Sequence, residues 1–364
     1  MHIYVHVPFC ARRCSYCDFA IAVRREVPSD AYVDTVLREW SSWLDQPVWE
    51  LAPLIDTIYF GGGTPSRLAP AAIAALLDGI RADRTVVAGA EITLEANPDD
   101  VTSEAAQAWR AAGVNRLSLG AQSFSAEALR WMHRTHDAAA IGRAVELARA
   151  AGLTLSLDLI FALPADVARS WEDDLDRALA LAPDHLSLYG LTTEPGTPLA
   201  RWTARGQAHP AEEGRYAIEY LLAHDRLEAA GFEHYEVSNA ARPGHRARHN
   251  AGYWSRAPYI GLGPSAHSGF GDRRQWNLRE WAGYERAVRA GTDWVEGSEA
   301  LDSQAVRLEQ LYLGLRTVDG VPRGWIPDQQ RESWRSRGWA RVEGDRVWLT
   351  AEGWLRIDAL AAAI

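Results

Sequence analysis

Three cysteines lie within eight residues near the start of the chain, and no other cysteine follows. Cys10, Cys14 and Cys17 have the spacing C-x3-C-x2-C directly after an apolar stretch. Thiolates on one loop can converge on a zinc ion or an iron–sulfur cluster. Structural zinc nearly always has four ligands, and only His2 or His6, turned back along the preceding strand, would supply the fourth. Thiolate sulfur is the usual ligand of a 4Fe–4S cube, so the spacing favours a cube with one iron left unligated by the protein.

Composition places the chain among ordinary globular proteins. The length of 364 residues suits one large domain with a smaller one. A content of 47% hydrophobic and 24% charged residues is ordinary for a globular protein. No apolar run approaches the ~20 residues of a membrane span, and the first residues lack the pattern of a signal peptide. We therefore expect a cytoplasmic protein with reduced thiols.

Charge and the absence of lysine exclude other functions. The net charge of −10 argues against nucleic acid as a partner, because phosphate binding needs a basic face. All 38 basic residues are arginine. The chain therefore has neither the lysine of a P-loop nor one for a Schiff base with pyridoxal phosphate.

The elements that must position the cysteines repeat one strand–helix unit through the first part of the chain. Asp30 and Thr102 are typical helix starts, and Gly113 and Gly152 typical helix ends. The predicted strands are 2–9, 56–62, 91–96, 116–122, 154–164 and 185–192, and the predicted helices lie near 30–45, 70–82, 103–112, 125–133, 137–151, 168–181 and 211–230. Such alternation predicts an α/β fold with a parallel sheet.

Polar residues mark the carboxyl ends of these strands. Active sites of β/α barrels are built on that face. We therefore predict a partial (β/α)6 barrel over residues 1–235 with its site at this mouth, although periodicity alone does not exclude an open sheet. The residues concerned are Cys10, Gly62, Glu95, Gln122, Asp158 and Thr192.

The remainder of the chain has a different texture. Residues 236–295 are rich in Gly, Pro, Arg and aromatics, which predicts a loop-rich segment. Residues 296–364 predict a small, mostly helical, winged-helix-like domain. Its expected elements are helices at 303–316, 328–337 and 351–363 and a hairpin at 340–350.

The cysteine loop, with Tyr16 before its last cysteine, resembles the signature of the radical S-adenosylmethionine (SAM) superfamily. That resemblance implies a 4Fe–4S cluster whose fourth iron is chelated by the amino and carboxylate groups of SAM. The stretch GGGTPS (61–66) is similar to the loop that receives the methionine amino group, which implies roles for Gly62, Gly63 and Thr64.

Further motifs resemble the oxygen-independent coproporphyrinogen III oxidase-like branch of that superfamily. They are LEANP around Glu95, GAQSF around Gln122 with Arg134 twelve residues on, and DLIFALP around Asp158. The resemblance implies that Glu95, Arg134 and Asp158 bind the methionine and ribose portions of SAM. Tyr4, Gln122 and Thr192 would complete the pocket.

Three features separate the two main activities of this branch. The oxidase pattern has a fourth cysteine where this chain has Phe19, and an extra N-terminal segment, whereas here Tyr4 is already in the first strand. His249 to Trp254 match the HNxxYW motif of the HemW-type heme chaperones. The resemblance therefore implies a heme chaperone that delivers heme to respiratory or other hemoproteins. A decarboxylating oxidase, a heme-modifying radical SAM methyltransferase and a scaffold braced by its cluster are the alternatives.

The HNAGYW motif supplies the candidate heme site. Histidine is a good axial heme ligand and aromatic rings offer flat apolar surface, so His249, Tyr253 and Trp254 are the predicted heme-binding residues. His245 and His267 compete for the ligand role, and Arg246, Arg248 and Arg256 are candidates to pair with propionates. Recipients, membrane-bound respiratory enzymes among them, are not identified by the sequence. The oligomeric state stays open, with a homodimer as one option.

Overall fold

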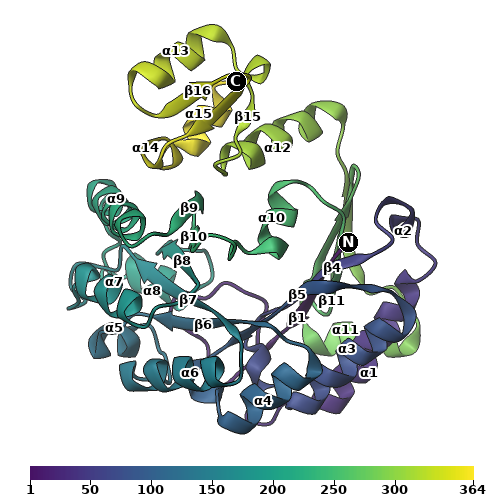
Figure 1. The fold of residues 1–364 in the computed structure, drawn as a ribbon. Helices are drawn as coiled ribbons and strands as arrows, with labels where there is room; N and C mark the ends of the chain where they lie inside the picture. The colour runs from purple at the N-terminus through teal and green to yellow at the C-terminus, as the bar shows by residue number, and fades with distance from the viewer.

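Six parallel strands form the frame of the structure, a computed structural model that describes residues 1–364. They are adjacent in the order β1, β4, β5, β6, β7, β8 and confirm the six predicted strands. Their bounds are β1 His2–Val7, β4 Ile55–Gly62, β5 Val86–Ala96, β6 Arg116–Gln122, β7 Thr154–Phe161 and β8 His185–Gly190. The sheet curves as an arc with helices on its outer side, and β1 and β8 do not pair with each other to close a barrel (Figure 1). The predicted partial barrel is confirmed.

The outer helices lie close to their predicted positions. They are α1 Ser29–Trp43, α3 Pro70–Asp83, α4 Ser103–Ala112, α5 Ala126–Trp131, α6 Ala138–Ala150, α7 Trp171–Ala180 and α9 Glu213–Ala229. The Thr102 hydroxyl accepts from the backbone N–H of Ala105, and Gly113 ends α4 in the left-handed conformation, as expected. Asp30 is not a cap, because α1 begins at Ser29 and places this carboxylate in the first turn, where the helix dipole favours it.

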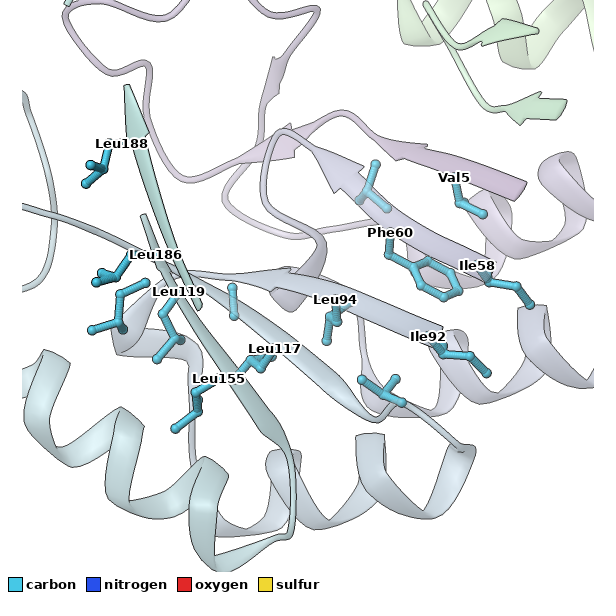
Figure 2. Packing of buried hydrophobic residues seen from close by; sticks show 14 of the residues in the cluster. Val5, Ile58, Phe60, Ile92, Leu94, Leu117, Leu119, Leu155, Leu186 and Leu188 are labelled. Carbon is cyan, nitrogen blue, oxygen red and sulfur yellow. The ribbon is translucent and has the colours of Figure 1, made fainter. Parts of the chain in front are cut away.

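The two faces of the parallel strands differ sharply. Toward the helices point Val5, Ile58, Phe60, Leu94, Leu117, Leu119 and Leu155, all buried in one large apolar core (Figure 2). The alternate residues are polar, among them Tyr4, Thr57, Glu95, Ser118 and Asp158. A parallel sheet covered on both faces normally has continuous apolar strands. The alternation here therefore identifies the concave face as the lining of a polar interior.

Residues 236–295 are not loop-rich, and that prediction is wrong. The segment and its flanks contain β9 Glu233–Glu236, β10 Asn239–Ala241, α10 Arg248–Trp254, β11 Tyr259–Leu262, β12 His267–Phe270, β13 Arg273–Asn277, α11 Trp281–Ala290 and β14 Val295–Ala300. β11 pairs parallel with β1, and β12 to β14 extend that edge in antiparallel fashion. The strands are short, and a Cβ on Gly261 would lie 2.1 Å from the His267 carbonyl oxygen. Close approach of neighbouring strands, rather than alternation, explains this composition.

The last residues form a separate small unit beside the open face of the arc (Figure 1). It comprises α12 Ser303–Leu315, β15 Val321–Pro322, α13 Asp328–Ser336, β16 Ala340–Glu343, β17 Arg346–Leu349, α14 Ala351–Trp354 and α15 Ile357–Ala362. The predicted helices and hairpin are present, except that the last helix is broken into α14 and α15. None of the helices in the structure combines the length and apolar character that a membrane crossing requires.

Candidate functional site

The cysteine loop opens into a cavity at the carboxyl ends of the parallel strands. Cys10 lies in the short strand β2 (Phe9–Cys10), which pairs with β3 (Ala22–Val23) and so closes the loop at its base. All three cysteines are free thiols and line one cavity of about 360 Å³. The loop is tied to the barrel because the buried Ser15 donates its N–H to the Met132 carbonyl. The spacing alone predicted this convergence.

Most residues implied by the resemblance line the same cavity. They are Gly62, Gly63, Thr64, Glu95, Gln122, Arg134, Asp158 and Thr192. Tyr4 lies one layer deeper, stacked on the ring of Tyr59 at 6.1 Å, and Tyr59 itself lines the cavity. The residues named for SAM therefore all line this cavity except Tyr4, which packs behind Tyr59.

The glycine loop after β4 packs too tightly for side chains. Gly62 has φ of +110°, and a Cβ there would lie 2.6 Å from the His6 ring. A Cβ on Gly63 would lie 2.7 Å from the Pro8 carbonyl. These glycines thus allow the loop backbone to pack closely against the end of β1. The Gly62 N–H already donates to Glu95, and the Thr64 hydroxyl donates to the Cys10 sulfur at 3.4 Å.

Two carboxyl groups stand on the polar wall. Glu95 accepts from the Tyr59 hydroxyl at 2.8 Å and from the Gly62 N–H at 3.1 Å. Burial raises the pKa of Glu95 to about 7, and the nearby charge of Asp158 adds to the effect. Asp158 accepts from the Ser118 hydroxyl at 3.1 Å, and burial raises its pKa to about 6. Both groups would ionise more readily beside a cation.

Arg134 supplies the positive charge of the cavity. Its guanidinium donates to the Gly120 carbonyl at 3.0 Å and to the Asn97 side chain, and its other terminal nitrogen lies 3.5 Å from the Cys14 sulfur. The guanidinium therefore lies in contact with one cysteine of the loop. Arg12 and Arg13, which lie within the cysteine loop itself, are exposed and donate to the backbone carbonyls of Arg134 and Cys17.

The donor set fits an iron–sulfur cluster. Burial raises the pKa of Cys17 to about 11 and that of Cys10 above its ordinary value, so these thiolates need a bound cation to form. No three His, Cys, Asp or Glu side chains lie in positions that could hold a single metal ion together. A 4Fe–4S cube does not require this, because it presents a separate iron to each thiolate. Gln122 leaves its buried side-chain oxygen without a partner, which leaves an acceptor available to a ligand in the cavity.

Comparison with known proteins agrees with this geometry. Residues 4–178 match the Radical SAM superfamily model. The chain is 36% identical over 367 residues to "Heme chaperone HemW" of Mycobacterium tuberculosis (strain CDC 1551 / Oshkosh), covering 100% of this chain and 94% of that protein. It is 41% identical over 270 residues to "Heme chaperone HemW" of Escherichia coli (strain K12), covering 73% and 69%. The chain belongs to the HemW family.

A solved structure supports the fold of this HemW-family chain. The coproporphyrinogen III oxidase HemN of Escherichia coli, described as a radical SAM enzyme, superposes with a TM-score of 0.82 at 23% identity. The match covers 99% of this chain and 88% of the oxidase. It therefore includes the C-terminal unit as well as the barrel.

The HNAGYW segment has a different place from the one predicted. It forms α10, and Glu91 accepts from the backbone N–H groups of Arg248 and His249 at the start of this helix. His249 is 1% exposed. Its Nδ1 is 2.7 Å from the Thr57 hydroxyl and its Nε2 is 2.9 Å from the Tyr253 hydroxyl.

His249 is therefore a packing residue in this structure, and its role as the axial heme ligand stays a prediction that requires this side chain to leave its present contacts. Both ring nitrogens have partners, and burial lowers the pKa of the ring well below its ordinary value. The ring stacks on Tyr59 at 5.0 Å, and Tyr59 in turn holds Glu95. The motif thus braces the polar wall from behind. Tyr253 and Trp254 are half-buried beside it.

The competing histidines lie away from the cavity. His267 is exposed and stacks on Trp276, and His245 lies 3.8 Å from Asp184. Arg246 and Arg256 pair with Glu233 and Glu309, and Arg248 donates to the Gly89 carbonyl.

Sequence reasoning missed several lining residues, namely Tyr59, Asn97, Ser118, His133 and Tyr189. Strand alternation could have found Tyr59, Ser118 and Tyr189, since each is two residues from an inward-facing position. Asn97 and His133 lie outside the strands, where no periodic signal exists.

Proposed function

We propose that this HemW-family chain is a heme chaperone that carries a 4Fe–4S cluster and SAM in the cavity described above. Its similarity to relatives named as heme chaperones along essentially their whole length carries the proposal. Phe19 supports it, because the oxidase pattern has a cysteine at this position. Heme would be handed to hemoproteins in the cytoplasm or at the membrane, with respiratory enzymes as first candidates.

The side chains of the cavity can be given roles toward the cofactors. The thiolates of Cys10, Cys14 and Cys17 would hold three irons of the cluster. When bound, such a cluster would supply an electron for chemistry on SAM. Arg134 would pair with the SAM carboxylate, since guanidinium and carboxylate form strong charge-assisted hydrogen bonds. Glu95 would accept from the SAM ammonium.

The remaining polar groups would orient the nucleoside. Asp158 faces the cavity with Ser118 donating to it, and carboxylate oxygens are natural acceptors for ribose hydroxyls. Gln122 offers its unpartnered oxygen. Tyr59, which donates to Glu95 and stacks on Tyr4, would keep this carboxylate in place.

Heme titration tests the proposed function. Heme is added to anaerobically purified, cluster-loaded protein and the Soret band is followed. We expect saturation at one heme per chain, with the oligomeric state measured by light scattering in the same samples. The same protein is incubated with coproporphyrinogen III, SAM and a reductant, and we expect no vinyl product. Porphyrinogen turnover without saturable heme binding would instead identify an oxidase, and methylated heme would identify a methyltransferase.

A further inference from the structure

The cavity contains one histidine that the cofactor assignment does not use. His133 lies between α5 and α6, directly before Arg134, and it is the one histidine among the residues lining the cavity. Its ring rests edge-on against Trp202 at 5.4 Å. Neither ring nitrogen has a hydrogen-bond partner within the protein, whereas both nitrogens of His249 and of His185 are engaged.

The backbone at His133 is held in an unfavourable conformation. Its φ is +59°, in the left-handed region that suits glycine. The conformation is fixed by the end of α5, because the N–H of His133 donates to the Arg130 carbonyl and that of Arg134 to the Leu129 carbonyl. A side chain kept at a strained position on a cavity wall suggests a functional constraint.

The same cavity has an apolar rim that contacts solvent. Phe19 is 60% exposed and Tyr189 is 45% exposed, and both line the cavity with Ile21 and Leu191. Exposed aromatic side chains grouped at one opening are typical of a binding site. Their flat surfaces suit a planar apolar macrocycle. Arg12, exposed in the same lining, offers a guanidinium to an anionic group of such a ligand.

We propose that heme binds at the mouth of this cavity with the imidazole of His133 as an axial iron ligand and with Phe19 and Tyr189 against the porphyrin. This inference rests on the proposed chaperone function and locates its heme site. A neutral imidazole with a free nitrogen is a normal heme ligand. Heme bound there would share a cavity with SAM, so each ligand would change the affinity of the chain for the other.

The test compares heme binding by the wild type and His133→Gly. Glycine removes the imidazole and suits the left-handed backbone, so the variant should fold and keep its cluster, which circular dichroism and iron content check. We expect loss of the histidine-ligated Soret and electron paramagnetic resonance signals, at least tenfold weaker heme binding, and recovery of the histidine-ligated signals when free imidazole is added. His209→Ala, an exposed histidine outside the cavity, is the matched control and should bind as the wild type does.

The outcomes separate the two claims. A wild type without saturable heme binding would overturn the proposed function itself. Saturable binding that is unchanged in His133→Gly would leave the function standing and overturn His133 as ligand. Weaker binding in His133→Gly that imidazole does not restore to the wild-type spectrum would also overturn the ligand role, because it would show only a structural effect. His249→Gln should retain the heme spectrum of the wild type.

Discussion

Replacement of Glu95 by glutamine removes the charge that the proposed function assigns to binding of the SAM ammonium. The amide keeps an oxygen that can accept from Tyr59 or from the Gly62 N–H, which donate at 2.8 and 3.1 Å in the wild type. Packing should therefore change little, while the interaction with the SAM ammonium loses its charge assistance. A hydrogen bond to a charged group contributes roughly 1.5–3 kcal/mol, so Glu95→Gln should weaken SAM binding by roughly 10- to 150-fold.

The pKa of Glu95 adds a pH dependence to this prediction. In the folded chain burial raises the pKa to about 7, so the carboxyl is mostly ionised at pH 8. At pH 6 only about a tenth of it is ionised, and a ligand that needs the carboxylate should then bind about tenfold more weakly. Asp158, with a pKa of about 6, adds to the loss only at lower pH. SAM affinity should therefore rise with pH between 6 and 8.

Anaerobic calorimetric titration of SAM into cluster-loaded protein at pH 6, 7 and 8 measures both effects. Wild-type affinity should rise with pH, and Glu95→Gln should be weak and flat over this range. Tyr59→Phe is the matched control, because it removes a donor but keeps the charge. Since the Tyr59 hydroxyl lowers the pKa of Glu95, the rise should move to higher pH. Equal affinities of wild type and Glu95→Gln at pH 8 would refute the assignment of Glu95.

Three further changes test other parts of the structure. Cys14→Ser should abolish the visible absorbance of the cluster, and full iron content in that variant would contradict the ligand assignment; Arg13→Ala is its control. Gly62→Ala should lower the melting temperature and weaken SAM binding, because the new methyl group meets His6 at 2.6 Å and φ is +110°; unchanged stability would show that the loop can relax. In the wild type, burial raises the pKa of Glu39 to about 7, so unfolding should release protons and stability should fall by about 3 kcal/mol as pH rises from 4.5 to 7. Denaturation of Glu39→Gln should lack the share of that slope that Glu39 contributes, and an equal slope in both proteins would exclude Glu39 as a source.

Features of the structure that depend on local periodicity or on residue spacing could be predicted from the sequence. Alternation located all six parallel strands, and the polar residue at each strand end indicated the cavity face, because parallel strands present their carboxyl ends on one side. The cysteine spacing predicted the convergence of three thiols. The family resemblance added Glu95, Arg134 and Asp158, and in the structure all three line the same cavity.

Features that depend on contacts between distant parts of the chain could not be predicted from the sequence. Residues 236–295 form β9 to β14 in part through pairing with β1, a partner far away in the chain, and short glycine-containing strands have no readable period. The burial of His249 was not predicted, because residue type alone says nothing about burial. Its two hydrogen-bond partners, Thr57 and Tyr253, come from β4 and α10. His133 was overlooked because a histidine between two helices carries no periodic signal.

Direct heme transfer tests the central claim most closely. The cluster-loaded chain is given one equivalent of heme and mixed with a heme-free b-type cytochrome in the presence of excess apomyoglobin, which captures released heme. The account predicts that the cytochrome acquires its characteristic spectrum faster than it does from free heme under the same conditions. Capture of all the heme by apomyoglobin, or failure of the chain to hold heme at all, would contradict a chaperone function.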